Sequence, residues 1–158
     1  MDLRLYHNSH EFYYRSSFGA VPSGSRLILR LRASGSDAQN CRARIRLWQI
    51  NVGESFVPMS YEDGIFTGIV TIPPKGCLLW YYFIIDDGHR TFYYGNNYDR
   101  LGGEGAKYPD VPPAYQVTVY DKDAHTPDWF KHAIVYQIFP DRFRHGTHTS
   151  GRLYGKKG

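Results

Sequence analysis

Residues 26–49 read RLILRLRASGSDAQNCRARIRLWQ, and this stretch decides the fold class. Apolar side chains occupy every second position twice, first at 27–31 and again at 41–47, and arginines fill most of the positions between them. A period of two places alternate side chains on opposite faces of an extended strand. Because residues 33–37 (ASGSD) carry the chemistry of a turn, the stretch predicts a hairpin with one buried face and one arginine-bearing face.

The same extended pattern returns along the chain at regular spacing. Further strands are predicted at 65–72, 78–85, 90–94 and 115–120, with shorter ones near 3–6 and 11–14. Turn signals separate them, and no segment before residue 125 has the 3.6-residue period of an amphipathic helix. Short strands with turns about every 8–12 residues predict an all-β fold, an immunoglobulin-like antiparallel β-sandwich over residues 1–120.

The character of the chain changes after residue 120. Residues 121–128 (DKDAHTPD) are polar and contain a proline, which is typical of a linker. Residues 133–139 (AIVYQIF) form an apolar run without alternation, as expected of a strand that is buried on both faces of a parallel sheet. Residues 129–158 are therefore predicted to be the truncated start of a second domain, whose one strand lacks its partners.

Two motifs give this second segment a family resemblance. TPDWFK at 126–131, followed by IVYQIFPDRF at 134–143, resembles the start of the catalytic barrel in the α-amylase superfamily of glycoside hydrolases (family 13), in its neopullulanase, cyclomaltodextrinase and amylopullulanase branch. The residues that match that family's first barrel strand are Tyr136, Gln137, Pro140, Asp141, Arg142 and Phe143. Segments 80–85, 92–96 and 115–120 resemble the N-terminal β-sandwich of those enzymes. The resemblance implies an N-terminal domain followed by the orphan first strand of a (β/α)₈ barrel.

The resemblance also implies the activity of the parent enzyme. That enzyme would hydrolyse O-glycosyl bonds in α-glucans such as starch, maltooligosaccharides, pullulan or cyclodextrins, with carboxylates at the mouth of its barrel. A (β/α)₈ barrel takes about 250 residues, and the family's carboxylates lie downstream of the first strand. We therefore expect no catalytic residue in this chain, and we expect an accessory domain that positions the barrel and offers a surface for α-glucan.

Metal ligands are scarce in the sequence. The family's calcium site often uses Asp and Asn residues after the first strand, but residues 144–151 (RHGTHTSG) hold no acid. Hard cations prefer clusters of oxygen ligands, so we expect no cofactor in this chain and calcium only in the parent enzyme. The two HxxH pairs, at 7–10 and 145–148, lack the further ligands that zinc requires. No metal site is predicted.

Aromatic side chains beside polar ones are the candidates for sugar binding. Tyr93 and Tyr94 end a predicted strand, and a GNN turn then leads to Tyr98. An aromatic ring offers a flat apolar platform to a sugar ring, and amide side chains can hydrogen-bond to its hydroxyl groups. The predicted carbohydrate site consists of Tyr93, Tyr94, Asn96 and Tyr98.

The strand at 78–85 is apolar on both faces, although a sandwich strand needs only one apolar face. One face bears Trp80, Tyr82 and Ile84. Together with Trp129, it is predicted to pack against the catalytic barrel or against a second copy in a homodimer, and a bound glucan is the second choice. The alternative function for the chain is therefore a packing or dimerisation module without sugar affinity.

The net charge of +4 is uneven along the chain. Residues 1–50 hold eight arginines against three acids, which gives +5 and leaves −1 for the remainder. The arginines leave nucleic-acid binding open, but no recognition helix or RNA-binding motif accompanies them, so we expect no nucleic-acid partner. No apolar run approaches the about 20 residues of a membrane span, and no signal region follows Met1. We expect a cytoplasmic protein without a membrane partner.

Overall fold

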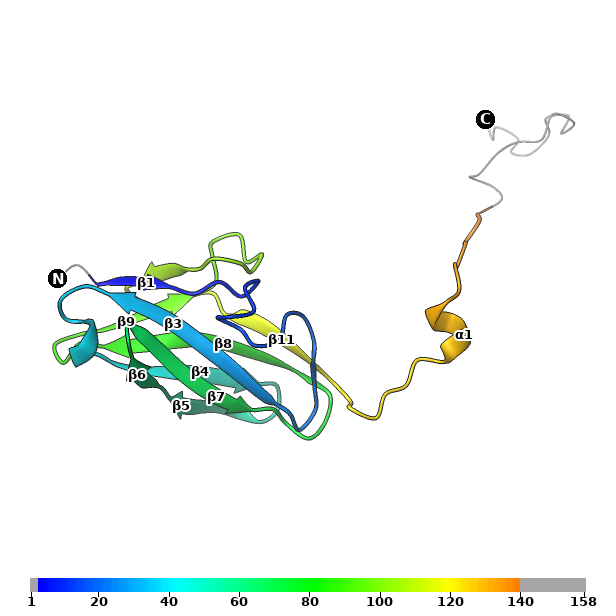
Figure 1. Ribbon diagram of the computed structural model, residues 1–158, viewed down its shortest axis with the longest axis horizontal. Coiled ribbons are helices and arrows are strands. Elements are labelled where there is room, and N and C mark those ends of the chain that lie inside the picture. The colour runs from blue at the N-terminus through cyan, green and yellow to red at the C-terminus, as the bar shows by residue number, and fades with distance from the viewer. Residues whose placement is uncertain (1–2, 140–158) are drawn as a thin grey trace, which may run out of the picture. The chain divides into compact units, whose positions relative to one another are not determined.

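The computed structural model describes residues 3–139 (Figure 1). The chain divides into two compact units between Ala124 and His125. The first unit is a β-sandwich of two sheets whose strands are almost all antiparallel. This confirms the all-β, immunoglobulin-like sandwich that the alternating sequence predicts.

The smaller sheet has four strands in the order β1-β3-β7-β6, and all its pairs are antiparallel. Its strands are β1 (Arg4–Tyr6), β3 (Arg26–Ser34), β7 (Ile65–Thr71) and β6 (Ser60–Glu62). Strands β3 and β7 form its long central ladder, and in both strands alternate residues are buried against the core.

The larger sheet has seven strands arranged around β8 (Cys77–Asp86). The others are β2 (Val21–Pro22), β4 (Arg42–Gln49), β5 (Gly53–Pro58), β9 (Thr91–Gly95), β10 (Ala106–Tyr108) and β11 (Tyr115–Tyr120). One edge of β8 pairs with β4, while the other edge is shared, with β11 along residues 77–81 and β9 along residues 83–86. The pair β2–β11 is parallel, which departs from the wholly antiparallel prediction.

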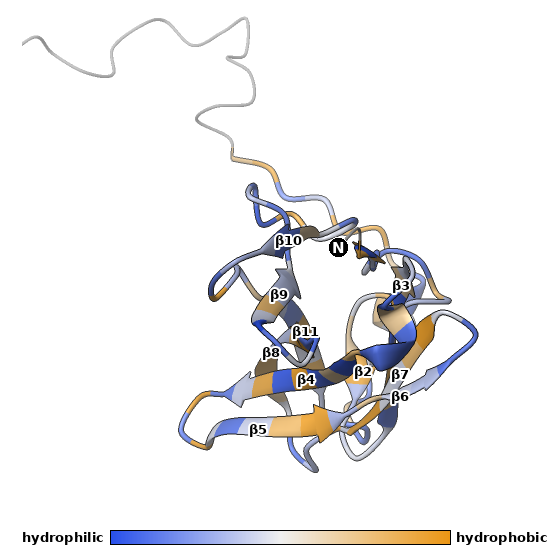
Figure 2. Cartoon of the chain, turned by 90° about the vertical axis from the view of Figure 1, so that its left-hand side faces the viewer, coloured by the Kyte–Doolittle hydropathy of each residue, from blue (hydrophilic) through white to orange (hydrophobic). Residues whose placement is uncertain are grey.

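The core lies between the inner faces of the two sheets. Because side chains alternate along each strand, every second residue of β3, β4 and β11 is buried, and Figure 2 shows the resulting alternation of hydrophilic and hydrophobic residues along β4. In the central strand β8, residues 81–85 are all buried. The largest fully buried apolar and aromatic side chains are Leu27, Leu29, Leu31, Ile45, Phe66, Ile72, Tyr81, Phe83, Ile85, Tyr94 and Tyr115.

The predicted hairpin over residues 26–49 is wrong. Both strands exist, but β3 belongs to the smaller sheet and β4 to the larger one, so they face each other across the core instead of pairing. A short 3₁₀-helix, η1 (Ala38–Asn40), carries the chain from one layer to the other. Each strand thus buries its leucine-rich face against the other sheet, and the arginines of the two strands lie on opposite outer faces.

The arginines of both strands cover aromatic rings. The guanidinium of Arg30 lies 4.8 Å from the ring centroid of Tyr13, and that of Arg32 lies 4.8 Å from that of Tyr6. On the other sheet Arg44 covers Phe56 at 5.0 Å and Arg46 covers Tyr82 at 5.3 Å. Such pairs combine cation–π attraction with burial of the arginine stem, so these arginines have a structural role that needs no nucleic acid.

The second unit, as far as residue 139, contains one short helix. In α1 (Asp128–Lys131), the side chains of Asp128 and Lys131 form an ion pair of 2.8 Å. The ring of Trp129 in this helix is exposed. Residues 133–139 have no regular secondary structure, so Tyr136 and Gln137 are not in a strand here. A parallel-barrel strand takes its hydrogen bonds from neighbours on both edges, and the barrel strand stays a prediction. The motif residues Pro140, Asp141, Arg142 and Phe143 lie outside the described residues.

Within residues 3–139 no helix is long and apolar enough to cross a membrane.

Candidate binding groove

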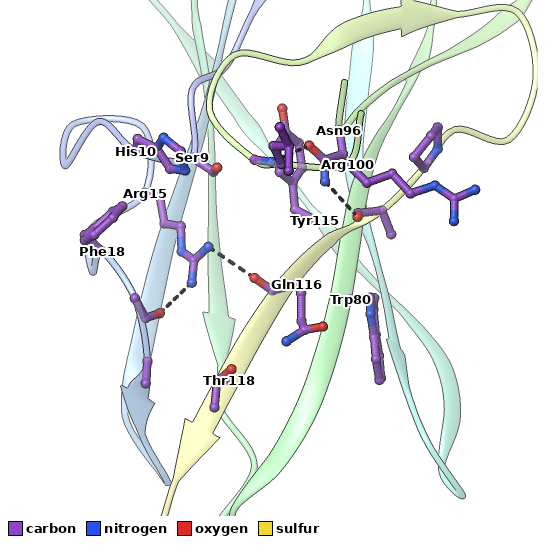
Figure 3. Close-up of a pocket in the computed structure, with 16 residues that line it drawn as sticks. Ser9, His10, Arg15, Phe18, Trp80, Asn96, Arg100, Tyr115, Gln116 and Thr118 are labelled. Atoms are coloured by element: carbon purple, nitrogen blue, oxygen red, sulfur yellow. Dashed lines mark hydrogen bonds between the residues drawn. The ribbon is translucent and has the colours of Figure 1, made fainter. Parts of the chain in front are cut away.

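An open groove of about 790 Å³ lies beside the outer face of β11 (Figure 3). Residues from three parts of the chain line it, namely 9–20, 96–102 and 113–118, and Trp80 from β8 completes the lining. The volume is within the range of small-ligand sites in proteins, about 300–1,000 Å³.

The groove exists because half of one edge of β11 has no partner strand. Strand β2 pairs with β11 only at Val119 and Tyr120. Beside the first half of β11, the side chain of Arg15 donates from Nη1 to the carbonyl oxygen of Gln116 at 3.2 Å, where a neighbouring strand would otherwise donate. Its Nη2 donates to the carbonyl oxygen of Gly19 at 2.7 Å. The segment 9–20 is thereby held near β11, and space for a ligand remains above the strand.

Hydrogen bonds fix the two loops at the upper end of the groove to each other. The amide of Ser9 donates to the carbonyl oxygen of Gly103 at 3.0 Å, and the amide of Gly103 donates to Oγ of Ser9 at 2.9 Å. Oδ1 of Asn96 accepts from the amide of Gly102 at 3.0 Å, and Gly102 has a positive φ of 76° and lies close to the ring of His10. A side chain at position 102 would meet that ring in a strained backbone conformation, so the glycine permits the close approach of the two loops.

Two aromatic rings and two polar side chains shape the groove. Figure 3 shows Phe18 and Trp80 on opposite sides, with Gln116 and Thr118 between them. Phe18 is 66% exposed, and the side chains of Gln116 and Thr118 also face solvent. The groove thus combines apolar aromatic surfaces with side chains that can form hydrogen bonds.

The ring of Trp80 extends the groove into a platform on the outer face of the sheet. Trp80 lies directly opposite Trp48 on β4 and directly opposite Gln116 on β11, and Trp48 in turn lies opposite Glu54 on β5. The two indole rings are half-buried, and their centroids are 5.0 Å apart. Directly opposed residues share one face of a sheet, so four strands present one row, Glu54–Trp48–Trp80–Gln116, beside the groove.

The structure does not bring the four predicted sugar-binding residues together. Tyr94 is only 2% exposed, and its hydroxyl group bonds with the backbone of His7 and with the amide of Gly105, each at 3.1 Å. Burial raises the pKa of Tyr94 to about 12. Asn96 is also buried, and its amide side chain bonds with backbone groups of Asn97, Gly102 and Ala114. Tyr94 therefore offers no surface to a sugar ring, whereas Asn96, although largely buried, lines the groove.

The other two residues of that predicted site point elsewhere. Tyr93 alternates with Tyr94 and lies on the outer face, where its ring contacts that of Tyr82 edge to face, with centroids 6.0 Å apart. Tyr98 is 77% exposed on the loop that follows β9, and its ring lies beside that of Tyr108, with centroids 5.2 Å apart. Neither lines the groove. Tyr93 and Tyr94 lie on opposite faces of β9, and Tyr98 lies on the loop that follows this strand.

The predicted packing face on β8 is largely covered by the sheet itself. Tyr82 and Ile84 are buried, and they do not form an open apolar surface as expected. Arg46 lies over the ring of Tyr82, while Arg44 and Tyr93 flank Ile84 on the neighbouring strands. Trp80 alone of the three remains half-exposed, at the groove.

Sequence reasoning missed the residues that form the groove. Gln116 and Thr118 could have been assigned to the outer face, because they alternate with the buried residues of β11. The pairing of Trp48 with Trp80 depends on the register between β4 and β8, and the place of Arg15 depends on a contact across about a hundred positions of sequence, between residues 15 and 116. Neither the Trp48–Trp80 pairing nor the position of Arg15 could be predicted from neighbouring residues in the sequence.

Potential metal ligands are dispersed. Within residues 3–139 no three His, Cys, Asp or Glu residues lie together as a metal site would require, and Cys41 and Cys77 are free thiols. His7, from the first HxxH pair, is fully buried, and both of its ring nitrogens take part in hydrogen bonds, whereas His10 is exposed at the groove. The second HxxH pair lies outside the described residues.

Comparison with known proteins gives a specific similarity. The chain is similar to a small part of three amylopullulanases. It is 40% identical over 153 residues to that of Thermoanaerobacterium thermosulfurigenes and 40% identical over 152 residues to that of Thermoanaerobacterium saccharolyticum, in each case over 90% of this chain. It is 38% identical over 162 residues, or 96% of this chain, to that of Thermoanaerobacter thermohydrosulfuricus. No family model matches the chain.

The matched region is a minor part of each relative. The chain spans 8% of the length of the first of these amylopullulanases, 12% of the second and 10% of the third. The similarity covers both units of this chain and supports the resemblance to glycoside hydrolases found in the sequence motifs.

Proposed function

We propose that this chain is the N-terminal accessory region of an α-glucan-hydrolysing enzyme of the α-amylase family, and that its sandwich holds an α-glucan chain in the groove beside β11. The observation that carries the proposal is the groove between Phe18 and Trp80, with Gln116 and Thr118 between the two rings and Trp48 beside the second ring. The similarity to amylopullulanases supports α-glucan as the ligand class.

Each group has a defined task in this proposal. The half-buried rings of Trp80 and Trp48 stack against the apolar faces of successive glucose units, and Phe18 closes the opposite side. Gln116 and Thr118 hydrogen-bond to the hydroxyl edges of the sugar. Because the groove is open and most hydroxyl groups keep their water, we expect weak binding, with a Kd of about 0.1–1 mM.

Hydrolysis is assigned to other parts of the parent protein. The chain spans about a tenth of the length of the amylopullulanases, and glycosidases need a pair of carboxyl groups about 5–10 Å apart across the scissile bond. We propose that starch, maltooligosaccharide, pullulan or cyclodextrin is held here and is cleaved by the barrel. The isolated chain should release no reducing sugar from these glucans above a heat-treated control.

One observation favours the alternative, a packing or dimerisation module. The loops 8–18 and 96–105, which are hydrogen-bonded to each other, carry the exposed apolar side chains of Phe12, Phe18, Tyr98 and Leu101. Exposed apolar groups that gather on one surface often mark protein contacts. In this alternative the loops contact the catalytic barrel or a second copy, and the groove binds no sugar.

A fluorescence titration with maltoheptaose tests the proposal. Indole emission should change saturably in a Trp129→Phe background, which removes the tryptophan of the second unit. Trp80→Ala should weaken binding at least about tenfold, whereas Tyr93→Ala, on the same outer face but outside the groove, should leave the Kd unchanged. Unaltered emission up to about 20 mM maltoheptaose would reject sugar binding and leave the packing module, while dimerisation is read separately by sedimentation. A calcium site, a homodimer and the cellular location stay predictions.

A further inference from the structure

We propose that the groove beside β11 contains an anion subsite, and that its ligand is an α-glucan that carries a phosphate monoester. The inference rests on the proposed function, since it adds a second recognition element to the same groove. Its basis is the charge of the lining residues and one buried guanidinium that has no acidic partner.

The charge of the groove has one sign. Its lining includes Arg15 and Arg100, and none of the lining residues is an Asp or Glu. Asp99 precedes Arg100 on the loop, but within residues 3–139 no carboxylate oxygen lies within 4.0 Å of the side-chain nitrogens of Arg15 or Arg100. A cleft lined by one sign of charge concentrates ligands of the opposite sign.

Arg15 is the unusual member of this set. It is only 7% exposed, and two of its nitrogens donate to the carbonyl oxygens of Gln116 and Gly19. Its Nε is buried without a hydrogen-bond partner. A guanidinium has five N–H donors and cannot lose its charge in a protein, and a buried charge without a counter-ion is costly. An anion in the groove would supply the missing opposite charge.

Arg100 supplies the exposed half of the subsite. Its side chain is exposed on the loop 96–103, and in Figure 3 it extends away from Arg15, on the other side of the groove. A phosphate monoester carries about two negative charges at pH 7 and three acceptor oxygens, and arginine is the side chain best suited to it. A phosphate bound beside the buried Arg15 would contact Arg100 after a change of rotamer, which the exposure of Arg100 allows.

A phosphorylated sugar suits the rest of the lining better than a free anion does. The groove is much larger than a single phosphate, and its other walls are the rings of Phe18 and Trp80 and the amide of Gln116. These groups contact sugar faces and hydroxyl groups in the proposed function. A glucan ester would use the rings and the two arginines at the same time, whereas inorganic phosphate would use the arginines alone.

The test compares three probes on the full chain by calorimetry, namely maltoheptaose, maltoheptaose with one 6-phosphate, and inorganic phosphate. We expect the phosphorylated glucan to bind about tenfold more tightly than the neutral glucan at low salt. The gain should shrink at about 0.5 M NaCl, because salt screens the charges. Inorganic phosphate should bind more weakly than either glucan.

Two variants inside the groove and one control outside it assign the gain in affinity to the groove. Arg100→Gln removes an exposed charge without touching the core and should bring the ratio of the two glucan affinities below about threefold. Arg42→Gln, an exposed arginine at the start of β4 and outside the groove, is the matched control and should keep the ratio. Arg15→Met should also abolish the gain, provided that the thermal transition shows a folded protein.

The outcomes separate the two proposals. If both glucans bind with equal affinity, glucan binding stands and the anion subsite is wrong. If neither glucan binds, the proposed function fails as well. If inorganic phosphate binds as tightly as the phosphorylated glucan, or if Arg42→Gln lowers the ratio as much as Arg100→Gln does, the site is not one for a glucan ester and this inference is overturned.

Discussion

The hydroxyl group of Tyr81 donates to Nε2 of His7 at 3.0 Å in the interior of the sandwich, where both side chains are fully buried. Nδ1 of the same histidine donates to the carbonyl oxygen of Arg30 at 2.7 Å. His7 therefore holds one proton, on Nδ1, and joins β8 of one sheet to β3 of the other. The rings of Phe83 and Tyr115 pack around it, with centroids 4.8 and 5.2 Å away.

This environment predicts a loss of stability in acid. Burial lowers the pKa of His7 to about 4, and the charge of Arg15 acts in the same direction. Above about pH 6.5 the histidine is neutral in both states; between pH 6.5 and 4 only the unfolded chain binds the proton, so folding becomes less favourable by up to about 3 kcal/mol. The change levels off below pH 4. Urea unfolding between pH 7 and 4 should show it, and His7→Gln, but not the exposed His89→Gln, should reduce that slope.

The hydroxyl group of Tyr81 should matter more than that of its neighbour. Tyr81→Phe leaves Nε2 of His7 without a donor in a dry site, which costs about 1–3 kcal/mol of unfolding free energy. Tyr115→Phe is the matched control, because that ring is equally buried and stacks on Tyr81 at 5.1 Å, but its hydroxyl group makes only a long contact of 3.4 Å. It should cost less than about 1 kcal/mol. Equal losses in the two variants would contradict the role given to the Tyr81–His7 bond.

The sandwich could be predicted from the sequence because its signal is local. Alternation along β3, β4 and β11 appears in consecutive residues and directly reports which side chains face the core. The partner of each strand is not a local property. The turn chemistry of residues 33–37 suits a hairpin as well as a crossing between layers, and only contacts across the core decide that β3 pairs with β7 and β4 with β8.

The residues of the groove could likewise be predicted only in part from the sequence. Tyr93 and Tyr94 are adjacent in a strand, so the sequence alone could place them on opposite faces of β9. By contrast, the row Glu54–Trp48–Trp80–Gln116 requires the registers of three strand pairs, and Arg15 reaches β11 from a segment without regular strands. These relationships are tertiary, so residues grouped by proximity in sequence do not come together in the structure, and of the four predicted sugar-binding residues only Asn96 lines the groove.

The arginines on the outer face of the larger sheet should differ in their contribution to stability. Arg46 covers the ring of Tyr82 and forms an ion pair of 3.0 Å with Glu54, while Arg42 on the same face is exposed. Arg46→Ala uncovers Tyr82 and should lower the unfolding free energy by about 1–2 kcal/mol. Arg42→Ala should change it by less than about 0.5 kcal/mol. Chemical denaturation measures both free energies. If Arg46→Ala left the unfolding free energy unchanged, the contact between Arg46 and the ring of Tyr82 would not stabilise the sheet.

Tyr94 and Trp80 should separate folding from glucan binding. Tyr94→Phe removes the hydroxyl group that bonds with the backbone of His7 and the amide of Gly105, so it should cost about 1–3 kcal/mol of stability. Its ring is buried outside the groove, so the Kd for maltoheptaose should not change. Trp80→Ala should show the converse, with weakened binding and a smaller loss of stability, because Trp80 is half-exposed. Calorimetric titration and thermal unfolding of the same two samples give both readouts. If a folded Tyr94→Phe variant bound maltoheptaose more weakly, the result would favour a sugar site near the loop after β9 and contradict the proposed site in the groove.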